Sequence, residues 1–192
     1  MSMRKLRNKL RQNKQDLIFA TNAGMYTPNN DPQGLYIENR KKLIGLDSAK
    51  KGYGNFYMQP NGVFLVDSMH KAHVVATPEF KKMEGKTLFA TQSGPMLLTK
   101  GKMNPHFNKG SKNTYVRSGV GVISPTKLVF IISNQPVNFY DFASLFKDKY
   151  KCQNALYLDG AISEMYASKL RRYEYGSDGM DYSVLISVSV DK

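Results

Sequence analysis

The chain has 192 residues, which is enough for one sizeable hydrophobic core and too few for two comfortable domains. A hydrophobic fraction of 41% with 11% aromatic residues argues against disorder, and no apolar run approaches the roughly 18 residues that a membrane helix needs. A net charge of +13 indicates an anionic partner such as a phosphorylated substrate, a cell-wall polymer, nucleic acid or lipid, although a solvated basic surface explains the charge equally well.

The opening segment is strongly basic. It holds six of the 28 basic residues and no acid, so it carries nearly half of the excess charge. Residues 4–14 are predicted to form a helix, because Leu6 and Leu10 lie one turn apart. We interpret residues 1–15 as a basic segment and residues 16–192 as one folded domain. No apolar stretch of roughly 7–15 residues follows the basic start, so we expect no signal peptide in this chain.

Short apolar runs separated by turn residues follow from there onward. A hairpin is expected at 34–46, and Asn61-Gly62 is the strongest short hairpin signal in the chain. Thr77 and Pro78 are typical of a helix start. Strands are expected at 16–20, 63–66, 73–76, 87–98 with a break, 115–123, 128–133, 155–158 and 183–190.

The clearest predicted helix spans residues 138–150. Asn138 can cap it, and Phe142, Leu145 and Phe146 share one face. The whole pattern contains about eight to ten strands and two or three helices, and most strands are joined by turns rather than by helices. The chain is therefore predicted to adopt an α+β fold, a single domain with a mixed, largely antiparallel sheet.

Four strand ends share a pattern in which an apolar run stops at a glycine beside a polar residue. Glycine permits positive φ and lets the backbone approach a ligand closely, so several such breaks at one sheet edge predict a cleft lined by backbone N–H groups. Each glycine taken singly is better explained as a simple turn. The four breaks are TNAGMY (21–26), TQSGPML (91–97), VRSGVGV (116–122) and LDGAISEMY (158–166).

Asp159 is the strongest candidate for a functional carboxylate, because it ends a strand that is expected to be buried, where its environment can shift its pKa. Glu164 follows five residues later. Paired carboxylates serve glycosyl transfer, one as acid and the other as nucleophile or base, and their oxygens also suit a hard cation such as calcium or magnesium. The sequence does not fix further ligands, so no metal site is predicted. A solvated carboxylate in an Asp-Gly turn is the alternative interpretation of Asp159.

Arg117 lies just before Ser118 and Gly119, among apolar residues. If it is buried, it needs an anionic partner, and its planar fork suits a phosphate group. An outward-facing arginine on a basic protein is an equally good interpretation. Asn22 supplies an amide donor and acceptor at a strand end, although simple turn chemistry also explains it. The single cysteine, Cys152, is expected to be a structural or surface thiol rather than a nucleophile, and the three histidines lack zinc-ligand spacing.

The ordered blocks NAGMY, GLYIE, GNFYMQPNGVF, QSGPML, RSGVGV and LDGAISEMY resemble those of the phosphodiester glycosidase family, which includes the lysosomal uncovering enzyme. The resemblance is closest to the bacterial branch and covers roughly residues 16–166. Each block alone is weak, whereas the ordered set is specific. The resemblance implies an α+β catalytic domain that hydrolyses the bond between the anomeric carbon of a sugar and a phosphate diester. Family members are often exported or periplasmic, and the localisation of this chain is left open.

The resemblance also implies a set of site residues, with Asp159, Glu164 and Arg117 as the catalytic group. The expected substrate-binding residues are Asn22, Gln92, Ser93, Gly94, Ser118, Gly119, Gly160 and Ser163. Two features depart from the family pattern. Ala161 stands where a second glycine is frequent, and only about 15 residues precede the first block, where family members usually carry further strands. The second departure predicts an exposed sheet edge or a fragment.

The expected function is cleavage of the glycosidic bond of a sugar 1-phosphodiester to release free sugar. The alternatives are a non-catalytic module that binds a polyanion, favoured by the basic opening segment, and an inactive family relative, suggested by Ala161. The expected partner is an anionic sugar phosphate or glycopolymer, with nucleic acid disfavoured. The cofactor requirement and the oligomeric state are left open.

Overall fold

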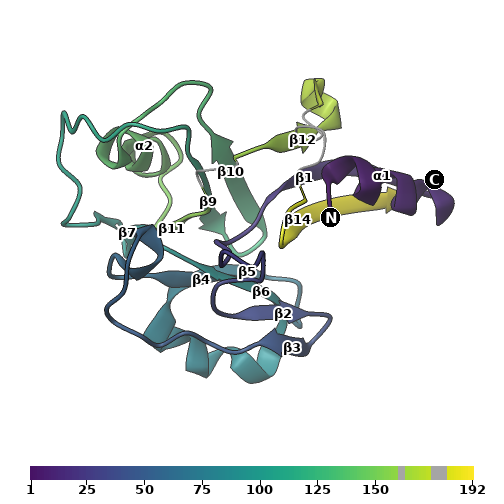
Figure 1. Ribbon diagram of the computed structural model, residues 1–192, viewed down its shortest axis with the longest axis horizontal. Helices are drawn as coiled ribbons and strands as arrows, with labels where there is room; N and C mark the ends of the chain where they lie inside the picture. Colours follow the sequence, from purple (N-terminus) through teal and green to yellow (C-terminus); the bar gives the residue numbers. More distant parts are fainter. Residues whose placement is uncertain (160–162, 174–180) are drawn as a thin grey trace.

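The computed structural model describes residues 1–159, 163–173 and 181–192, and Figure 1 shows the arrangement of its elements. Three antiparallel sheets form the protein, with strand orders β3-β2-β6-β4-β5, β10-β9-β11-β7-β8 and β13-β12-β1-β14. The α+β fold predicted from the sequence is confirmed. None of the helices in these ranges is long and apolar enough to cross a membrane.

The helices are α1 (Met3–Gln12) and α2 (Phe139–Ser144), which continues as the π-helical turn η4 (Leu145–Lys149), and the short 3-10 turns are η1 (Asn55–Tyr57), η2 (Thr77–Lys82), η3 (Glu84–Lys86) and η5 (Ser168–Leu170). The strands are β1 (Gln15–Asn22), β2 (Tyr36–Glu38), β3 (Lys41–Ile44), β4 (Gly62–Asp67), β5 (Ala72–Ala76), β6 (Thr87–Ser93), β7 (Met96–Thr99), β8 (Lys102–Met103), β9 (Ser118–Ser124), β10 (Lys127–Ile132), β11 (Asn154–Tyr157), β12 (Met165–Ala167), β13 (Arg172–Tyr173) and β14 (Leu185–Asp191).

The two five-stranded sheets pack face to face, and their inner layer is the main core. Alternate residues of β4, β9 and β11 point into this layer, where Phe64, Val120 and Leu156 belong to one buried cluster. On the outer face of the β9–β11 sheet, Phe142 and Phe146 pack from the helical segment α2–η4. The layers are therefore helix, sheet and sheet, with η2 below the second sheet (Figure 1).

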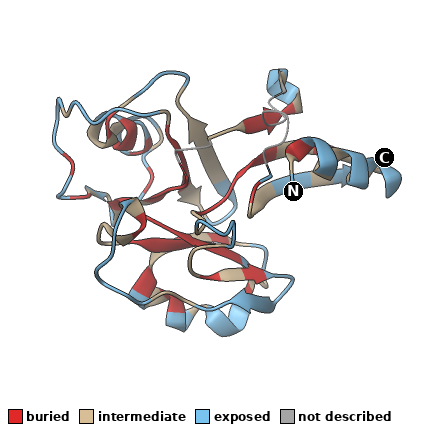
Figure 2. Cartoon of the chain, viewed as in Figure 1, coloured by how far each residue is buried: buried red, intermediate tan, exposed pale blue. Residues whose placement is uncertain are grey.

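The third sheet forms an arm beside these layers. β1 pairs with both β12 and β14, and α1 packs on β1 through a small cluster that includes Met3, Leu17 and Tyr166. Both chain termini lie in this arm, and its outer end is largely exposed, whereas the inner strands β4, β6, β9 and β11 of the sheets beside it are mostly buried (Figure 2). β1 runs from the arm into the body of the protein, so its last residues reach the ends of strands in the main sheets.

Local patterns predicted most elements. The hairpin at 34–46 is confirmed as β2 and β3, and the helix at 138–150 is confirmed with a π-helical second half. The prediction of a hairpin turn at Asn61-Gly62 is wrong. β4 lies between β5 and β6, so Gly62 enters a central strand directly, and the turn to β5 lies at residues 67–71 instead.

Candidate functional site

Segments from three parts of the sequence meet at the main-chain carbonyl of Asp159. Three side chains donate to its oxygen: Asn22 Nδ2 at 2.8 Å, Ser118 Oγ at 2.9 Å and Ser163 Oγ at 2.7 Å. The Asn22 amide also donates to Ser118 Oγ at 3.2 Å. Asn22 ends β1, Ser118 begins β9 and Ser163 precedes β12, so the structure brings these predicted site residues together. The network fixes the orientation of the peptide that carries the Asp159 side chain.

The position of Asp159 follows from the end of β11. The Leu158 amide continues the sheet by donating to Ser118 O at 2.9 Å, after which the Asp159 amide donates to Ala23 O at 3.3 Å. The chain thus leaves the sheet and crosses to the end of β1. Asp159 is only 8% exposed there. The interpretation of Asp159 as a solvated carboxylate in an Asp-Gly turn is therefore wrong.

Two tyrosines lie within the electrostatic reach of Asp159. Burial and then the Asp159 charge raise the pKa of Tyr26. Burial raises the pKa of Tyr157 to about 12, where the Arg117 charge opposes the rise and the Asp159 charge adds to it. Sequence reasoning missed both tyrosines, because aromatic residues beside apolar runs look like core residues. The only signals were that Tyr26 stands in the block NAGMY and that Tyr157 lies directly before the block LDGAISEMY.

Arg117 lies just before β9, near the end of β11. The last paired residues of these strands are Gly119 and Tyr157, and Tyr157 lies within the electrostatic reach of both Arg117 and Asp159. Arg117 is 0% exposed, so the buried interpretation of this residue is correct.

The hydrogen bonds of the Arg117 guanidinium go to neutral oxygen atoms. Nε donates to Val137 O at 2.7 Å, and Nη2 donates to both Asn113 O and Asn113 Oδ1 at 3.1 Å. Cζ lies 3.6 Å from the centre of the Phe139 ring. Nη1 is buried and has no hydrogen-bond partner among the residues that the structure describes. Burial lowers the pKa of the guanidinium, with Tyr157 opposing this effect. An anion beside Nη1 would stabilise this buried charge.

Glu164 is joined to the same network through its backbone. Its amide donates to Asn22 Oδ1 at 3.3 Å, and its carbonyl accepts from Thr21 Oγ1 at 3.0 Å. Its carboxylate accepts a short hydrogen bond from the Tyr182 hydroxyl. A paired role with Asp159 stays a prediction. Within the described ranges, no three His, Cys, Asp or Glu side chains cluster as metal ligands do.

The Gln92 side chain joins separate loops inside the protein. Its Oε1 accepts from the amides of Leu35 at 2.9 Å and Asp47 at 3.0 Å. Its Nε2 donates to Asp47 O at 2.7 Å and Thr77 Oγ1 at 3.2 Å. All of its hydrogen-bonding capacity is therefore used within the chain. A direct contact of Gln92 with substrate stays a prediction.

Close backbone packing explains two of the glycine breaks. A Cβ atom on Gly24 would overlap the carbonyl oxygen of Gln92, and one on Gly94 would lie 2.6 Å from Phe56 O. The segment 93–95 also reaches the end of β11, because the Tyr157 amide donates to Pro95 O at 3.1 Å. These glycines let the four segments meet.

The structure describes the surroundings of Ser93 and Gly119, two of the remaining predicted site residues, but not those of Gly160. Ser93 is buried, and its Oγ has no partner among the described residues. A Cβ on Gly119 would lie 3.0 Å from Leu156 O, so this glycine permits close strand packing. Gly160 lies outside the described residues, as does Ala161. Substrate contacts at these positions stay predictions.

Comparisons with known proteins bear on the family. The family model for phosphodiester glycosidase matches residues 15–186. The chain is 42% identical over 148 residues to the uncharacterized protein YigE of Escherichia coli (strain K12), a match that covers 77% of this chain and 57% of YigE. The chain thus spans little more than half the length of that relative.

A solved structure shares the fold. The catalytic domain of zebrafish N-acetylglucosamine-1-phosphodiester alpha-N-acetylglucosaminidase, auto-inhibited by its pro-peptide, superposes with a TM-score of 0.58 at 16% identity. The superposition covers 90% of this chain and 62% of the zebrafish chain. The resemblance first seen in six short blocks thus extends over nearly the whole chain, which belongs to the phosphodiester glycosidase family.

Proposed function

We propose that the chain hydrolyses the glycosidic bond of a sugar 1-phosphodiester and releases free sugar. The observation that carries the proposal is that buried Arg117, whose Nη1 has no partner in the described part of the chain, and buried Asp159 both lie within the electrostatic reach of Tyr157. Membership of the phosphodiester glycosidase family supports the reaction class. The name of the zebrafish relative describes an enzyme that acts on a phosphodiester of N-acetylglucosamine.

The Arg117 and Asp159 charges act on the two atoms of the bond that breaks, the phosphate oxygen and the anomeric carbon. Arg117 stabilises the negative charge on the phosphate as the leaving group departs. Asp159 stabilises the positive charge that develops at the anomeric carbon and accepts a proton from the attacking water. A phosphate monoester leaves with less need for protonation than an alkoxide, so one carboxylate suffices. Asn22, Ser118 and Ser163 hold Asp159 in position, and Gln92 positions the loops around the site.

Hydrolysis of sugar 1-phosphodiesters by purified variants tests these roles. We expect Asp159→Asn to lower kcat by about 10²–10⁴-fold, as for loss of a positioned acid or base. Arg117→Lys keeps the charge but lacks the planar fork, and we expect it to retain more activity than Arg117→Ala. Asp148→Asn, at an exposed carboxylate on η4, is the matched control and should leave the rate unchanged. Equal rates in all four variants would contradict the assignment.

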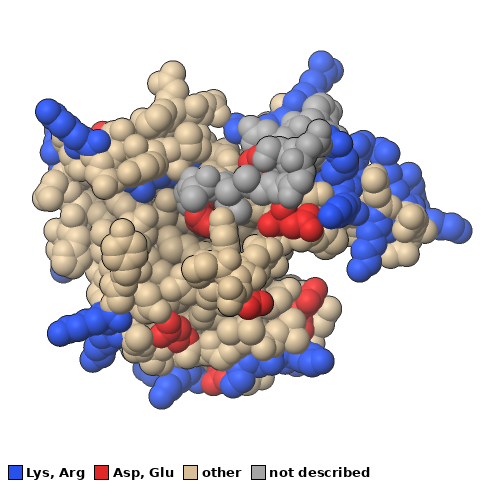
Figure 3. All heavy atoms as spheres, viewed as in Figure 1, with Lys and Arg blue, Asp and Glu red and all other residues tan. Residues whose placement is uncertain are grey.

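A second candidate function, polyanion binding, is favoured by the surface of α1. Arg4, Lys5, Lys9 and Arg11 of this helix are exposed, and Figure 3 shows basic side chains gathered over it. A polyanion binder would lose affinity steeply as salt is raised and would tolerate Asp159→Asn. Salt-dependent binding to a phosphate polymer without hydrolysis of any sugar 1-phosphodiester would favour this candidate over the enzyme.

A further inference from the structure

A polar cavity lies beside the Arg117 guanidinium. It has a volume of about 200 Å³, and no carboxylate is among its lining residues. Two of its walls contact Arg117 directly: Asn113 accepts hydrogen bonds from Nη2, and Phe139 stacks against Cζ. We call it the amide pocket because three asparagine side chains line it. The lining residues are Asn55, Met58, His106, Phe107, Asn108, Ser111, Asn113, Phe139 and Tyr140.

The loop that forms most of the amide pocket is fixed at both ends. At its start, Asn104 Nδ2 donates to Met96 O at 3.0 Å and Asn104 Oδ1 accepts from the His106 amide at 3.1 Å. At its far end, Arg117 holds Asn113. In the same lining, the rings of Phe107 and Phe139 stack with centroids 4.8 Å apart and planes 6° apart. The pocket is therefore formed before any ligand arrives, as is usual for small-molecule sites.

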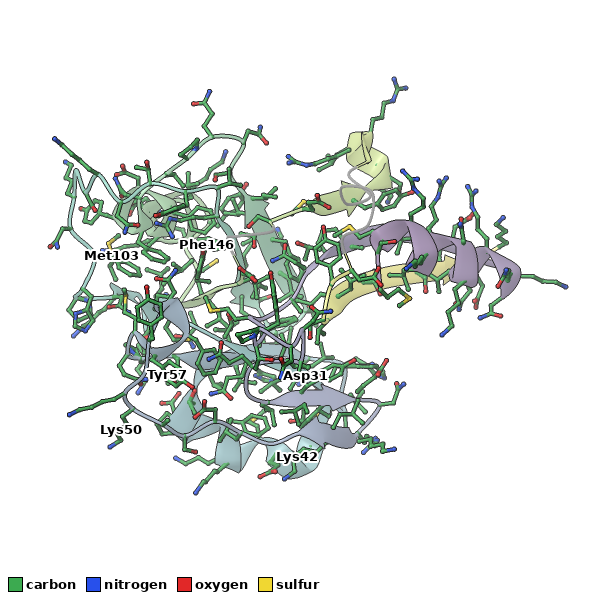
Figure 4. All side chains as sticks on the ribbon, in the orientation of Figure 1. Asp31, Lys42, Lys50, Tyr57, Met103 and Phe146 are labelled. Atoms are coloured by element: carbon green, nitrogen blue, oxygen red, sulfur yellow. The ribbon has the colours of Figure 1, made fainter. Side chains whose placement is uncertain are left out.

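The opposite wall is fixed in a similar way. η1 carries Asn55, and the Tyr57 hydroxyl in the same turn donates to Asp47 Oδ2 at 2.9 Å. In Figure 4, the labelled residues Tyr57 and Lys50 lie on the left of the view, and Met103 and Phe146 lie above them. Met103 packs against the core cluster that contains Phe146, so the pocket rests on a packed base.

The amide pocket is connected to the candidate catalytic site by a continuous set of contacts. Phe139, in its wall, packs edge to face with Tyr157 at 4.9 Å between ring centres. Tyr157 in turn lies within the electrostatic reach of both Arg117 and Asp159. Arg117 thus has the pocket residues Asn113 and Phe139 on one side and Tyr157 on the other, which makes the pocket the nearest described cavity for a group attached to a phosphate at Arg117.

The chemistry of the amide pocket suits hydroxyl groups near phosphate. Amide, hydroxyl and imidazole groups both donate to and accept from hydroxyls. Exposed lysines flank the pocket in sequence on both sides, at Lys50 and Lys51 before Asn55 and at Lys109 and Lys112 around Ser111. With no carboxylate in the lining, this environment favours an anion.

We propose that the amide pocket binds the alcohol side of the substrate, and that this alcohol is a hydroxyl-rich polyol carrying phosphate. The inference rests on the proposed function and names the substrate class of the same site. It predicts that the enzyme distinguishes substrates by the group beyond the phosphate, as well as by the sugar that it releases.

Kinetics with two substrates that share one sugar provides the first test. One carries a methyl group beyond the phosphate and the other a glycerol unit. We expect the double variant Asn108→Ala/Ser111→Ala to raise KM about fivefold to tenfold for the glycerol substrate alone, with kcat unchanged, because only that substrate loses hydrogen bonds. Asn29→Ala, at an exposed asparagine elsewhere, is the matched control. An equal change in KM for both substrates would overturn the proposal.

Binding measurements separate this inference from the proposed function. Glycerol 3-phosphate, glycerol and inorganic phosphate are titrated by calorimetry into the wild type and the variants. We expect glycerol 3-phosphate to bind best and to lose affinity in Asn108→Ala/Ser111→Ala and in Lys109→Gln/Lys112→Gln, but not in Lys81→Gln/Lys82→Gln. Pocket-dependent binding without hydrolysis of either substrate supports the pocket and refutes the enzyme. Equal affinity for glycerol 3-phosphate in every protein refutes the pocket, whatever the rates.

Discussion

At the residue scale, buried amide side chains act mainly on the backbone of distant segments. Asn22 holds the carbonyl of Asp159, Gln92 holds both the amide and the carbonyl of Asp47, and Asn104 holds the carbonyl of Met96. Each of these side chains replaces a main-chain partner that the local structure does not supply. Removing one leaves buried polar groups unsatisfied, which costs more than the net value of the hydrogen bond.

Asn22→Ala tests this cost at the candidate site. The substitution removes the donor to Asp159 O at 2.8 Å and the acceptor for the Glu164 amide at 3.3 Å. We expect it to lower the free energy of unfolding by about 1–3 kcal/mol and to lower hydrolysis as well. Urea unfolding and initial rates are the measurements. Asn29→Ala should change neither; an Asn22→Ala protein as stable and active as the wild type would show that the network is dispensable.

The turn between β4 and β5 gives a pH-dependent contribution to stability. Asp67 Oδ1 accepts from the amides of Lys71 and Met69, and Oδ2 lies 2.9 Å from His73 Nε2. The Lys71 amide first, and then His73, hold the pKa of Asp67 below its ordinary value of 3.8. A lowered folded-state pKa means that this stabilisation is complete above the ordinary value and is lost as the pH falls through the lower one.

Asp67→Asn provides the corresponding measurement. The wild type should lose stability on acidification below about pH 4, as Asp67 becomes protonated. The variant should be less stable at pH 7 and should show a smaller further loss at low pH. Thermal unfolding from pH 7 to pH 2.5 records both. A variant whose pH profile runs parallel to that of the wild type would remove Asp67 as the source.

Residues of the candidate site were predictable to different degrees. Asn22, Ser118, Asp159 and Ser163 lie at strand ends, and abrupt changes from apolar to polar residues mark such ends in the sequence. The neutral oxygens around Arg117 were not predictable, since they come from a loop and from Val137, about 20 residues away, and are chosen by tertiary packing.

At the element scale, β9 shows how one strand accommodates two neighbours. Gly121 faces the helical segment α2–η4, where a Cβ atom would lie 2.7 Å from both Cys152 Sγ and Phe146 Cδ1. The sequence GVGV predicts a strand weakened by glycine. In the structure, the absence of a side chain at Gly121 lets the Phe146 ring lie directly on the backbone of β9.

Gly121→Ala should therefore destabilise the protein. The added methyl group forces Phe146 or the strand to move in a packed layer, and we expect a loss of about 1–3 kcal/mol. Gly85→Ala is the control, because no atom lies within 4 Å of its Cβ position. Denaturant midpoints of the two variants give the comparison. Equal midpoints would indicate that Phe146 and β9 can shift to accept the methyl group without a loss of stability.

Local signals succeed for elements that local geometry decides. The β2–β3 hairpin has its turn residues in the left-handed region at Asn39 and Arg40, as a tight turn requires. Asn61-Gly62 carries a stronger turn signal in the sequence. There the pairing of β4 with β6 overrides it, and such long-range pairing has no signature within a short window.

At the scale of the whole molecule, charge and core lie in different places. The main core lies between the two five-stranded sheets, whereas basic residues cover α1 in the arm (Figure 3). α1 attaches to the arm through Met3, Leu6 and Leu10, so its charged face is not needed for packing. Removal of surface charge from this face should thus change binding without changing the fold.

Lys9→Gln/Arg11→Gln tests this separation. We expect the variant to elute from a heparin column at lower salt than the wild type, with an unchanged unfolding midpoint, because each lost cation reduces counterion release. Lys81→Gln/Lys82→Gln removes the same charge from η2 as a control. If both variants elute at the same salt concentration, binding to heparin depends on the net charge of the protein and not on the position of the α1 residues.

The three donors to the Asp159 carbonyl have a consequence for the folding of the protein. Asn22 and Asp159 are 137 residues apart in sequence, and Ser118 and Asp159 are 41 apart, so their hydrogen bonds arise only after the arm has docked on the sheets. A nascent or half-assembled chain consequently has no ordered candidate site. Order at this site then becomes the last property acquired during maturation, and its recovery after denaturation reports completion of the entire architecture.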